Sequence, residues 1–229
     1  MSAPQNIAVI GASGGIGGAI LDACKNRYGD ANIQTLSRSA KTIDIVDEAS
    51  VAAAARRAGH SLDLVIVATG MLHGANIAPE KSLRDLDTAR LEEVFRTNAI
   101  GPALVMKHFL PLMRKKERSV FAALSARVGS ISDNYLGGWY SYRASKAALN
   151  QLIRTAAIEQ ARKHPHCAVI GLHPGTVDTD LSRPFQGNVP EGKLFTPDFT
   201  ANALLDVTEQ ITPAQTGRVF AWDGVEVPA

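Results

Sequence analysis

Tyr142 and Lys146 lie four residues apart in the segment YSYRASKAALN. On a helix, this spacing places both side chains on one face, about one turn apart. A free tyrosine has a pKa of about 10, so it acts as a base at neutral pH only if a nearby cation favours its phenolate. The pair therefore predicts proton transfer to or from one bound substrate, although Tyr and Lys also fall at this spacing by chance in many helices.

A glycine-rich turn, GASGGIG, lies between the first predicted strand and the first predicted helix. Glycines permit a tight turn and let backbone N–H groups approach a pyrophosphate at the positive end of a helix. The turn predicts dinucleotide binding, and an ordinary glycine-rich turn is the alternative. The residues that we expect to contact the cofactor here are Gly11, Ser13, Gly14, Gly15, Ile16 and Gly17.

The end of the second predicted strand bears on which cofactor is bound. In NAD-binding proteins an acid about twenty residues beyond the glycine turn binds the adenosine ribose hydroxyls. This chain has Ser37 and Arg38 there. Both could bind a ribose 2′-phosphate through charge-assisted hydrogen bonds, although Arg38 could also be an ordinary solvated side chain. NADP(H) is therefore favoured, with NAD(H) as the alternative.

Short apolar runs alternate with helical stretches, which is typical of parallel βαβ units. We expect a Rossmann-type, doubly wound parallel sheet in a three-layer α/β/α arrangement. The predicted strands are residues 6–10, 33–36, 62–68, 119–124 and 168–172, and the predicted helices are residues 15–27, 47–57, 88–113 and 139–163.

One domain spanning residues 1–229 accounts for this pattern, since a second catalytic domain has no room. Residues 181–197, LSRPFQGNVPEGKLFTP, carry three prolines and two glycines. That composition predicts a long excursion without regular structure before a final helix, and loops of this size often close over a substrate. We therefore expect a substrate lid at residues 181–197.

Composition excludes several classes of partner. The formal net charge is +2 with scattered basic residues, so we expect no nucleic-acid partner, and no segment approaches the length of a membrane span. Cys24 and Cys167 are the only cysteines, and the N-terminus lacks a signal-peptide pattern. These features indicate a reduced, cytoplasmic protein that binds a small molecule.

The six histidines are dispersed, so we expect no metal site. His73 and His173 follow predicted strands at the sheet edge where ligands bind. Either could line the pocket, but we favour solvated histidines. Side chains that could form an apolar substrate wall, or serve packing or subunit contact instead, are Tyr135, Leu136, Trp139, Tyr140 and Phe185.

The glycine turn and YSYRASKAALN together resemble the short-chain dehydrogenase/reductase family, and the resemblance covers nearly the whole chain. It implies that Tyr142 protonates a carbonyl oxygen and that Lys146 lowers the tyrosine pKa and binds the nicotinamide ribose. Asn98, in FRTNAIGP, resembles the asparagine whose kinked helix holds a water for a proton relay. The resemblance also implies that Asp44 and the backbone of Ile45 hold the adenine.

The segment HPGTVDT resembles the family stretch that binds the nicotinamide carboxamide, although a simple Pro-Gly turn is the alternative. This implies cofactor contacts from Pro174, Gly175, Val177 and Thr179.

Two stretches depart from the family pattern. Many relatives carry a serine pair in which the second serine orients the substrate carbonyl, whereas this chain has Ser125 followed by Ala126. We expect Ser125 to take that role, with Ser130 as the alternative. The family Asn-Asn-Ala-Gly is replaced by Ala68, Thr69 and Gly70, which implies weaker adenosine contacts and intact chemistry.

PEKSLRDLD and GRVFAWDG resemble the sniffer-like carbonyl reductases and the C-factor group. We therefore expect NADPH-dependent reduction of a small carbonyl compound, or the corresponding alcohol oxidation. A cofactor-binding signalling protein with little turnover is the alternative. A sugar-nucleotide epimerase would need a larger substrate region. Ala147, Ala148 and Leu152 suit the helix pairing by which relatives form homodimers or homotetramers.

Overall fold

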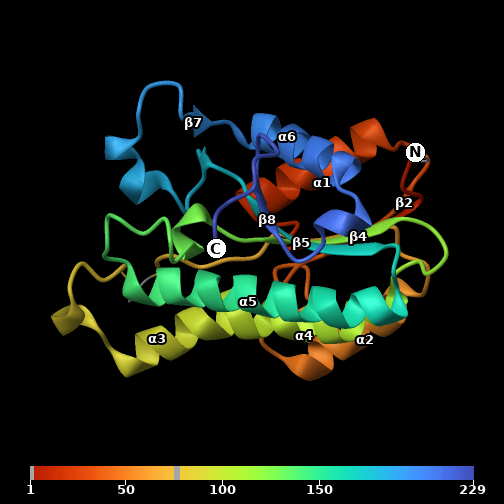
Figure 1. The fold of residues 1–229 in the computed structure, drawn as a ribbon, viewed down its shortest axis with the longest axis horizontal. Helices are drawn as coiled ribbons and strands as arrows, with labels where there is room; N and C mark the ends of the chain where they lie inside the picture. The colour runs from red at the N-terminus through yellow and green to blue at the C-terminus, as the bar shows by residue number, and fades with distance from the viewer. Residues whose placement is uncertain (1–2, 75–77) are drawn as a thin grey trace.

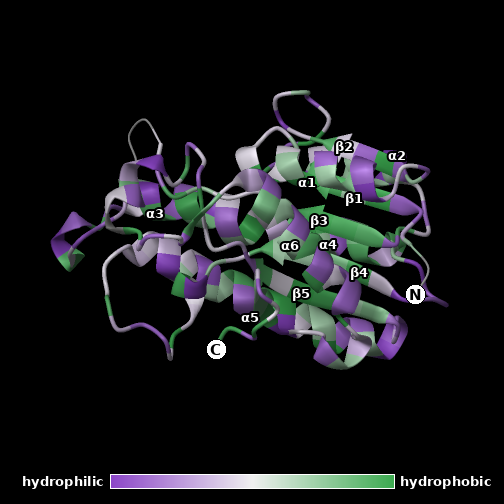
Figure 2. Ribbon diagram, turned by 90° about the horizontal axis from the view of Figure 1, so that it is seen from above, coloured by the Kyte–Doolittle hydropathy of each residue, from purple (hydrophilic) through white to green (hydrophobic). Residues whose placement is uncertain are grey.

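Six parallel strands form the central sheet of the computed structural model, in the order β2-β1-β3-β4-β5-β8. The structure describes residues 3–74 and 78–229. Figure 2 shows the first five strands side by side, with β3 and β4 hydrophobic along most of their length. The sheet strands are β1 Asn6–Ile10, β2 Asn32–Leu36, β3 Leu64–Val67, β4 Ser119–Leu124, β5 Cys167–His173 and β8 Val219–Ala221, and a separate pair is β6 Thr176–Val177 with β7 Leu194–Phe195.

Helices cover both faces of the sheet (Figure 1). Helices α1 and α6 pack on one face, and α2, α4 and α5 pack on the other. The helices are α1 Gly15–Arg27, α2 Glu48–Ala58, α3 Thr88–Phe95, α4 Gly101–Phe109, α5 Tyr140–Lys163 and α6 Pro197–Gln210. The predicted three-layer doubly wound fold is confirmed. Within residues 3–74 and 78–229, no helix has both the length and the apolarity that crossing a bilayer requires.

The central strands stand out in the sequence as apolar runs because they are buried. Every residue of β3 and β4 is buried, because helices cover both faces of these central strands. The core under α4 and α5 includes Phe109 and Leu149, and the core under α1 and α6 includes Ile20 and Leu204. The two cysteines are buried and free, one in each core.

The predicted single helix at residues 88–113 is wrong in detail. It consists of α3, a π-helical turn at Arg96–Ile100, α4 and a 3₁₀ turn at Leu110–Leu112. The π turn widens the helix around Asn98, whose amide bonds backbone groups outside the helix. The hydrophobic periodicity of the sequence cannot reveal a hydrogen bond to a residue outside the helix.

The predicted irregular excursion at residues 181–197 also needs correction. It contains a 3₁₀ helix at Arg183–Asn188 and strand β7, which pairs with β6. Strand β8 was not predicted. These elements are short, and the strands are defined by pairing with remote segments, so local periodicity carries little signal for them.

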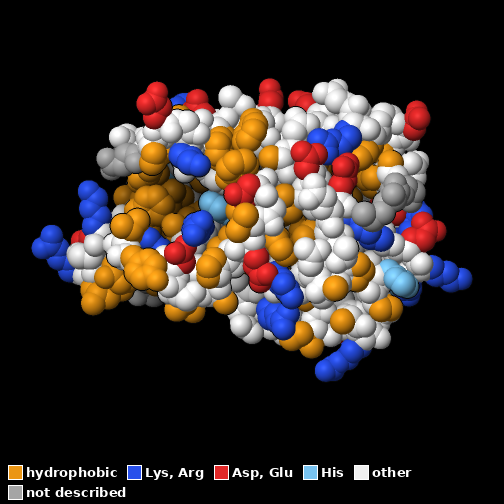
Figure 3. Space-filling model, turned by 45° about the horizontal axis from the view of Figure 1, so that its top comes forward, with side chains coloured by type: hydrophobic (Ala, Val, Ile, Leu, Met, Phe, Trp, Pro, Cys, Tyr) orange, Lys and Arg blue, Asp and Glu red, His pale blue; other side chains and the backbone are white. Residues whose placement is uncertain are grey.

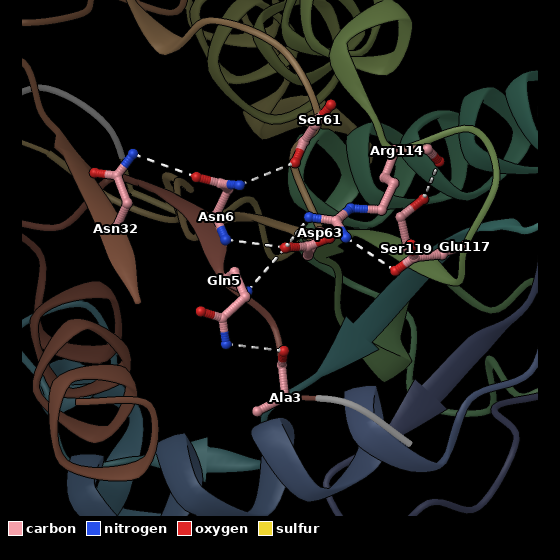
Figure 4. Close-up of polar contacts among 9 residues, drawn as sticks. All are labelled: Ala3, Gln5, Asn6, Asn32, Ser61, Asp63, Arg114, Glu117 and Ser119. Carbon is pink, nitrogen blue, oxygen red and sulfur yellow. Dashed lines mark hydrogen bonds and ion pairs between the residues drawn. The ribbon is translucent and has the colours of Figure 1, made fainter. Parts of the chain in front are cut away.

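A partly buried ion pair joins the starts of strands, at the end of the sheet opposite their carboxyl ends (Figure 4). Asp63 immediately precedes β3, and its Oδ2 accepts hydrogen bonds from the backbone N–H groups of Gln5 at 2.8 Å and Asn6 at 2.9 Å. Its Oδ1 lies 2.6 Å from Nε of Arg114, which precedes β4. One carboxylate therefore ties the starts of β1, β3 and β4 together.

A buried acid, Glu80, holds the start of α5. Glu80 is 4% exposed, and its Oε2 accepts the backbone N–H of Ser141 at 3.1 Å while its Oε1 accepts the Ser141 hydroxyl. Its backbone oxygen accepts the N–H of Trp139. Trp139 has a φ of 52°, so α5 begins from a left-handed residue without a side-chain cap of its own. A carboxylate from a remote segment supplies the negative charge favoured at a helix N-terminus.

We expect Asp63→Ala to lower the free energy of unfolding by about 2 kcal/mol, because it leaves two backbone N–H groups without their acceptor and leaves Arg114 with Glu117 alone. Urea unfolding followed by circular dichroism measures this. Asp22→Ala is the matched control, since Asp22 makes only an exposed contact with Lys25. Equal unfolding midpoints for the two variants would contradict the assigned role of Asp63.

We expect Glu80→Ala to lower the free energy of unfolding by about 2 kcal/mol and to speed amide hydrogen exchange in the first turn of α5. Glu80→Gln should lose less, because its amide can still bond Ser141. The control is Glu93→Ala, on the exposed face of α3. Unchanged exchange at Ser141 in Glu80→Ala would show that the carboxylate does not hold this helix end.

Candidate active site

Two adjoining cavities lie at the carboxyl ends of the strands, where doubly wound folds bind ligands. Each has a volume of about 490 Å³. One extends toward Arg38 and the other toward Lys146. They form one continuous cleft, because both are lined by Ser13, Gly14, Ala68, Thr69 and Gly70.

The glycine turn is shaped for close contact with a phosphate. Gly11 has a φ of +88°, and a Cβ on Gly17 would lie 2.1 Å from the Gly11 oxygen. Gly17 thus packs the turn against α1 and does not line the cleft, whereas Gly11, Gly14 and Gly15 do. Helix α1 begins at Gly15 with no acidic residue in its first turn. Its N-terminal N–H groups are therefore suited to an anion.

The far end of the cleft holds the residues predicted to bind the adenosine part of a cofactor. Ser37, Arg38, Asp44 and Ile45 all line it, and Arg38 is exposed. Asp44 Oδ1 accepts the backbone N–H of Val46 at 3.2 Å, so this acid also stabilises its own turn. The structure brings these four residues together, so this end of the cleft carries one cation, Arg38, and one carboxylate, Asp44.

Tyr142 and Lys146 lie together on α5, and the Lys146 Nζ is 5.8 Å from the centre of the Tyr142 ring. Nζ donates a hydrogen bond to the Leu124 oxygen at 2.8 Å. Burial raises the pKa of Tyr142 to about 12 and lowers the pKa of Lys146 to about 8. The pKa of Tyr142 is thus raised by burial and not lowered by the Lys146 ammonium, as the family resemblance had implied. At neutral pH Tyr142 carries its proton and can act as an acid.

Asn98 is fully buried in the π turn. Its Nδ2 donates to the Met71 oxygen at 2.8 Å and to Ser145 Oγ at 3.1 Å, and its Oδ1 accepts the Met71 N–H. Met71 follows the Ala68–Gly70 stretch of the cleft, so Asn98 fixes that stretch against α5. A Cβ on Gly70 would lie 3.6 Å from Lys146 Nζ and 3.8 Å from Asn98 Oδ1, which places both groups around the same point.

The two candidate serines lie in different surroundings. Ser125 lines the cleft with Tyr142, and its hydroxyl donates to Asn150 Oδ1 at 2.6 Å. Ser130 is buried, and its hydroxyl lies 3.3 Å from the backbone oxygen of Ala229. Of the two, the structure brings only Ser125 to the cleft.

A smaller cavity of about 190 Å³ adjoins the tyrosine. Figure 3 shows apolar side chains gathered around a hollow at the end of the molecule that carries β7 in Figure 1. Tyr135 and Leu136 do not belong to it, being 87% and 92% exposed. The cavity is lined mainly by apolar groups, which include Ile16, Leu72, Val128, Trp139, Leu181, Phe185 and Val189.

The segment after β5 closes one side of both cavities. Pro174 and Thr179 line the cleft and the smaller cavity, and Gly175 and Val177 line the smaller one. A Cβ on Gly15 would lie 2.7 Å from Thr179 Cγ2, so this segment packs directly against the start of α1. Residues predicted to hold the nicotinamide therefore lie between the glycine turn and Tyr142.

The two histidines that we expected to be solvated, His73 and His173, are only partly exposed. His173 lines the smaller cavity, and His73 Nε2 lies 3.1 Å from the backbone oxygens of Asp180 and Leu181. Phe185 packs edge-on against both His73 and Trp139, with ring centres 5.7 and 5.1 Å apart. Their positions after strands were the available signal, but the tertiary contacts that bring residues 181–185 over the cavity are not local.

The part of the chain that the structure describes contains no cluster of three or more His, Cys, Asp or Glu side chains able to hold a metal ion.

Residues 31–189 match the short chain dehydrogenase family. The chain is similar to C-signal of Myxococcus xanthus, with 36% identity over 64% of this chain and 83% of that protein. It is also similar to 1-hydroxy-2-glutathionyl-2-methyl-3-butene dehydrogenase of Rhodococcus sp. (strain AD45), with 32% identity over 80% of this chain and 76% of that protein.

The fold is similar to that of NADPH-bound carbonyl reductase from chicken fatty liver, with a TM-score of 0.78, 26% identity, and coverage of 98% of this chain and 99% of that chain. It is also similar to the carbonyl reductase Sniffer of D. melanogaster, with a TM-score of 0.77, 19% identity, and coverage of 99% and 100%. The family match and these relatives agree with the glycine turn and the tyrosine-lysine pair, and the chain belongs to the short-chain dehydrogenase family of oxidoreductases.

Proposed function

We propose that this protein reduces a small carbonyl compound with NADPH and that Tyr142 donates the proton. The observation that carries the proposal is the continuous cleft from Arg38 to Lys146, which opens beside Tyr142 onto an apolar cavity of about 190 Å³. A cavity of this size and lining suits a compact, largely apolar carbonyl substrate.

NADPH, when bound, supplies a hydride for the carbonyl carbon. Tyr142 gives its hydroxyl proton to the carbonyl oxygen, so the substrate leaves as an alcohol. The Lys146 ammonium stabilises the tyrosinate that remains, and its hydrogen bond to Leu124 holds it in place. We expect Asn98, which is buried close to Lys146, to complete a proton relay from solvent, and Ser125 lines the cleft beside Tyr142.

The cofactor preference rests on the end of β2. Ser37 and Arg38 line the cleft there, and the residues that directly follow β2 include no acid to repel a 2′-phosphate. Asp44 and Ile45 border the adenine side, Ala68, Thr69 and Gly70 lie along the middle, and the glycine turn meets the pyrophosphate. The carbonyl reductase from chicken was solved with NADPH bound, which agrees with this assignment.

A cofactor-binding signalling protein with little turnover is the second candidate. It is favoured by the likeness to C-signal and by Ala126, which leaves the cavity without a hydroxyl at that position. The two functions share the cleft and differ in whether Tyr142 transfers a proton. A protein that binds NADPH tightly but leaves a broad panel of aldehydes, ketones and alcohols unchanged would favour signalling.

We also expect a homodimer or homotetramer located in the cytoplasm. Ala147 and Ala148 line a surface hollow of about 840 Å³ beside α5, and Leu152 is 36% exposed. Small side chains on an uncovered helix face suit close pairing with a second copy. Residues 181–197 are proposed as the substrate lid, because Phe185 contacts Trp139 across the cavity.

Tyr142→Phe should lower kcat/KM for an accepted carbonyl by about 10²- to 10⁴-fold, since it removes only the proton donor. NADPH affinity, measured by fluorescence, should stay within a few-fold of the parent. Tyr135→Phe is the matched control, because its hydroxyl is on an exposed residue. Full activity in Tyr142→Phe would refute the proposed mechanism.

Arg38→Asp should weaken NADPH binding by about 10- to 100-fold and leave NADH binding similar or improved, because a carboxylate repels the 2′-phosphate. Fluorescence titration with both cofactors measures the change. Arg56→Ala, an exposed change on α2, should alter neither affinity. A parent protein that prefers NADH would overturn this interpretation of the end of β2.

A further inference from the structure

His173 ends β5 beside Ser125, the residue that follows β4. Leu124 pairs with Leu172 in the parallel register, and the Ser125 N–H donates to the Leu172 oxygen at 2.8 Å. Residues in matching positions of neighbouring parallel strands project to the same face of a sheet. Ser125 and His173 are therefore neighbours on one face.

That face is the one covered by α5, the helix that carries Tyr142. The Ser125 hydroxyl bonds Asn150 of α5, and a Cβ on Gly171, two residues before His173, would lie 3.3 Å from Ile153 of α5. The three side chains of Ser125, Tyr142 and His173 line the same cavity of about 190 Å³. A substrate oxygen beside Tyr142 therefore lies within the space that His173 borders.

Neither position of the expected serine pair presents a free hydroxyl donor to this cavity. The Ser125 hydroxyl directs its hydrogen to Asn150 Oδ1 at 2.6 Å, and the next residue, Ala126, has only a methyl group. Tyr142 supplies a proton to the carbonyl oxygen, but a second donor is needed to orient that oxygen and to stabilise its developing charge.

The His173 ring has unused hydrogen-bonding capacity. Its Nδ1 is buried and has no hydrogen-bond partner within residues 3–74 and 78–229. A buried polar atom without a partner costs free energy that a ligand or water can recover. Burial, with a smaller contribution from the nearby Arg127, lowers the pKa of His173 to about 4, against an opposing effect of Asp223. The ring is neutral at neutral pH and presents one N–H donor.

We propose that His173 donates a ring N–H to the carbonyl oxygen of the bound substrate, next to the Tyr142 hydroxyl, and so takes the orienting role expected of a serine at the end of β4. The proposal rests on the proposed carbonyl reduction. His173 keeps its proton throughout, while the proton that forms the alcohol comes from Tyr142. A neutral imidazole can polarise a carbonyl in this way, because a hydrogen bond to the oxygen strengthens as negative charge develops there.

The test compares His173→Ala, His173→Gln and the double variant His173→Ala/Ala126→Ser, with NADPH and 4-nitrobenzaldehyde. His173→Ala should lower kcat/KM by about 10²- to 10³-fold without changing NADPH affinity. His173→Gln keeps an N–H donor and should retain at least about tenfold more activity than His173→Ala. Ala126 lines the same cavity, so the added serine should recover about tenfold of the loss.

His60→Ala, an exposed histidine change, is the control and should match the parent. Parental kcat/KM in His173→Ala would overturn the proposal. Equal losses in His173→Ala and His173→Gln, with no recovery by Ala126→Ser, would also overturn it, because they indicate packing alone.

A parent that binds NADPH but reduces no carbonyl would refute the proposed function and not this inference. The His173 ring ¹⁵N resonances then decide: a shift on adding 4-nitrobenzaldehyde to the NADPH complex supports the hydrogen bond, and unchanged resonances refute it.

Discussion

The buried ammonium of Lys146 is the constraint on which the rest of the site depends. A charge removed from water needs polar partners, and the Leu124 oxygen at the end of β4 supplies one at 2.8 Å. Two glycines pack closely around the Lys146 side chain. A Cβ on Gly129 would lie 2.8 Å from Lys146 Cβ, and a Cβ on Gly70 would lie 3.6 Å from Lys146 Nζ. Helix α5 can therefore pack against the sheet only in a narrow range of positions. Those positions determine where Tyr142 meets the cavity.

The burial that holds Lys146 also sets the acid-base properties of the site. It raises the pKa of Tyr142 to about 12 and lowers the pKa of Lys146 to about 8, so at neutral pH the tyrosine keeps its proton and the lysine is mainly the ammonium. A protonated Tyr142 is suited to donating a proton, as the proposed carbonyl reduction requires.

The two acids far from the chemistry show how the fold maintains this geometry. Asp63 joins the starts of three strands, and Glu80 holds the first turn of α5. Asp63 thus restrains the sheet and Glu80 restrains α5, at opposite ends of the molecule. The position of His173 also depends on the sheet, because the register of β4 and β5 places it beside Ser125.

The sequence alone determined the fold class, the glycine turn and the tyrosine-lysine pair, because these depend on local hydrophobic period and on spacing within one or two turns. Strands β1 and β4 and helix α1 have the predicted limits. Tertiary structure alone decided the π turn at Asn98, the pairing of β6 with β7, and which of Ser125 and Ser130 lines the cleft. Each depends on a partner far along the chain, and a single sequence carries no local record of which remote groups meet.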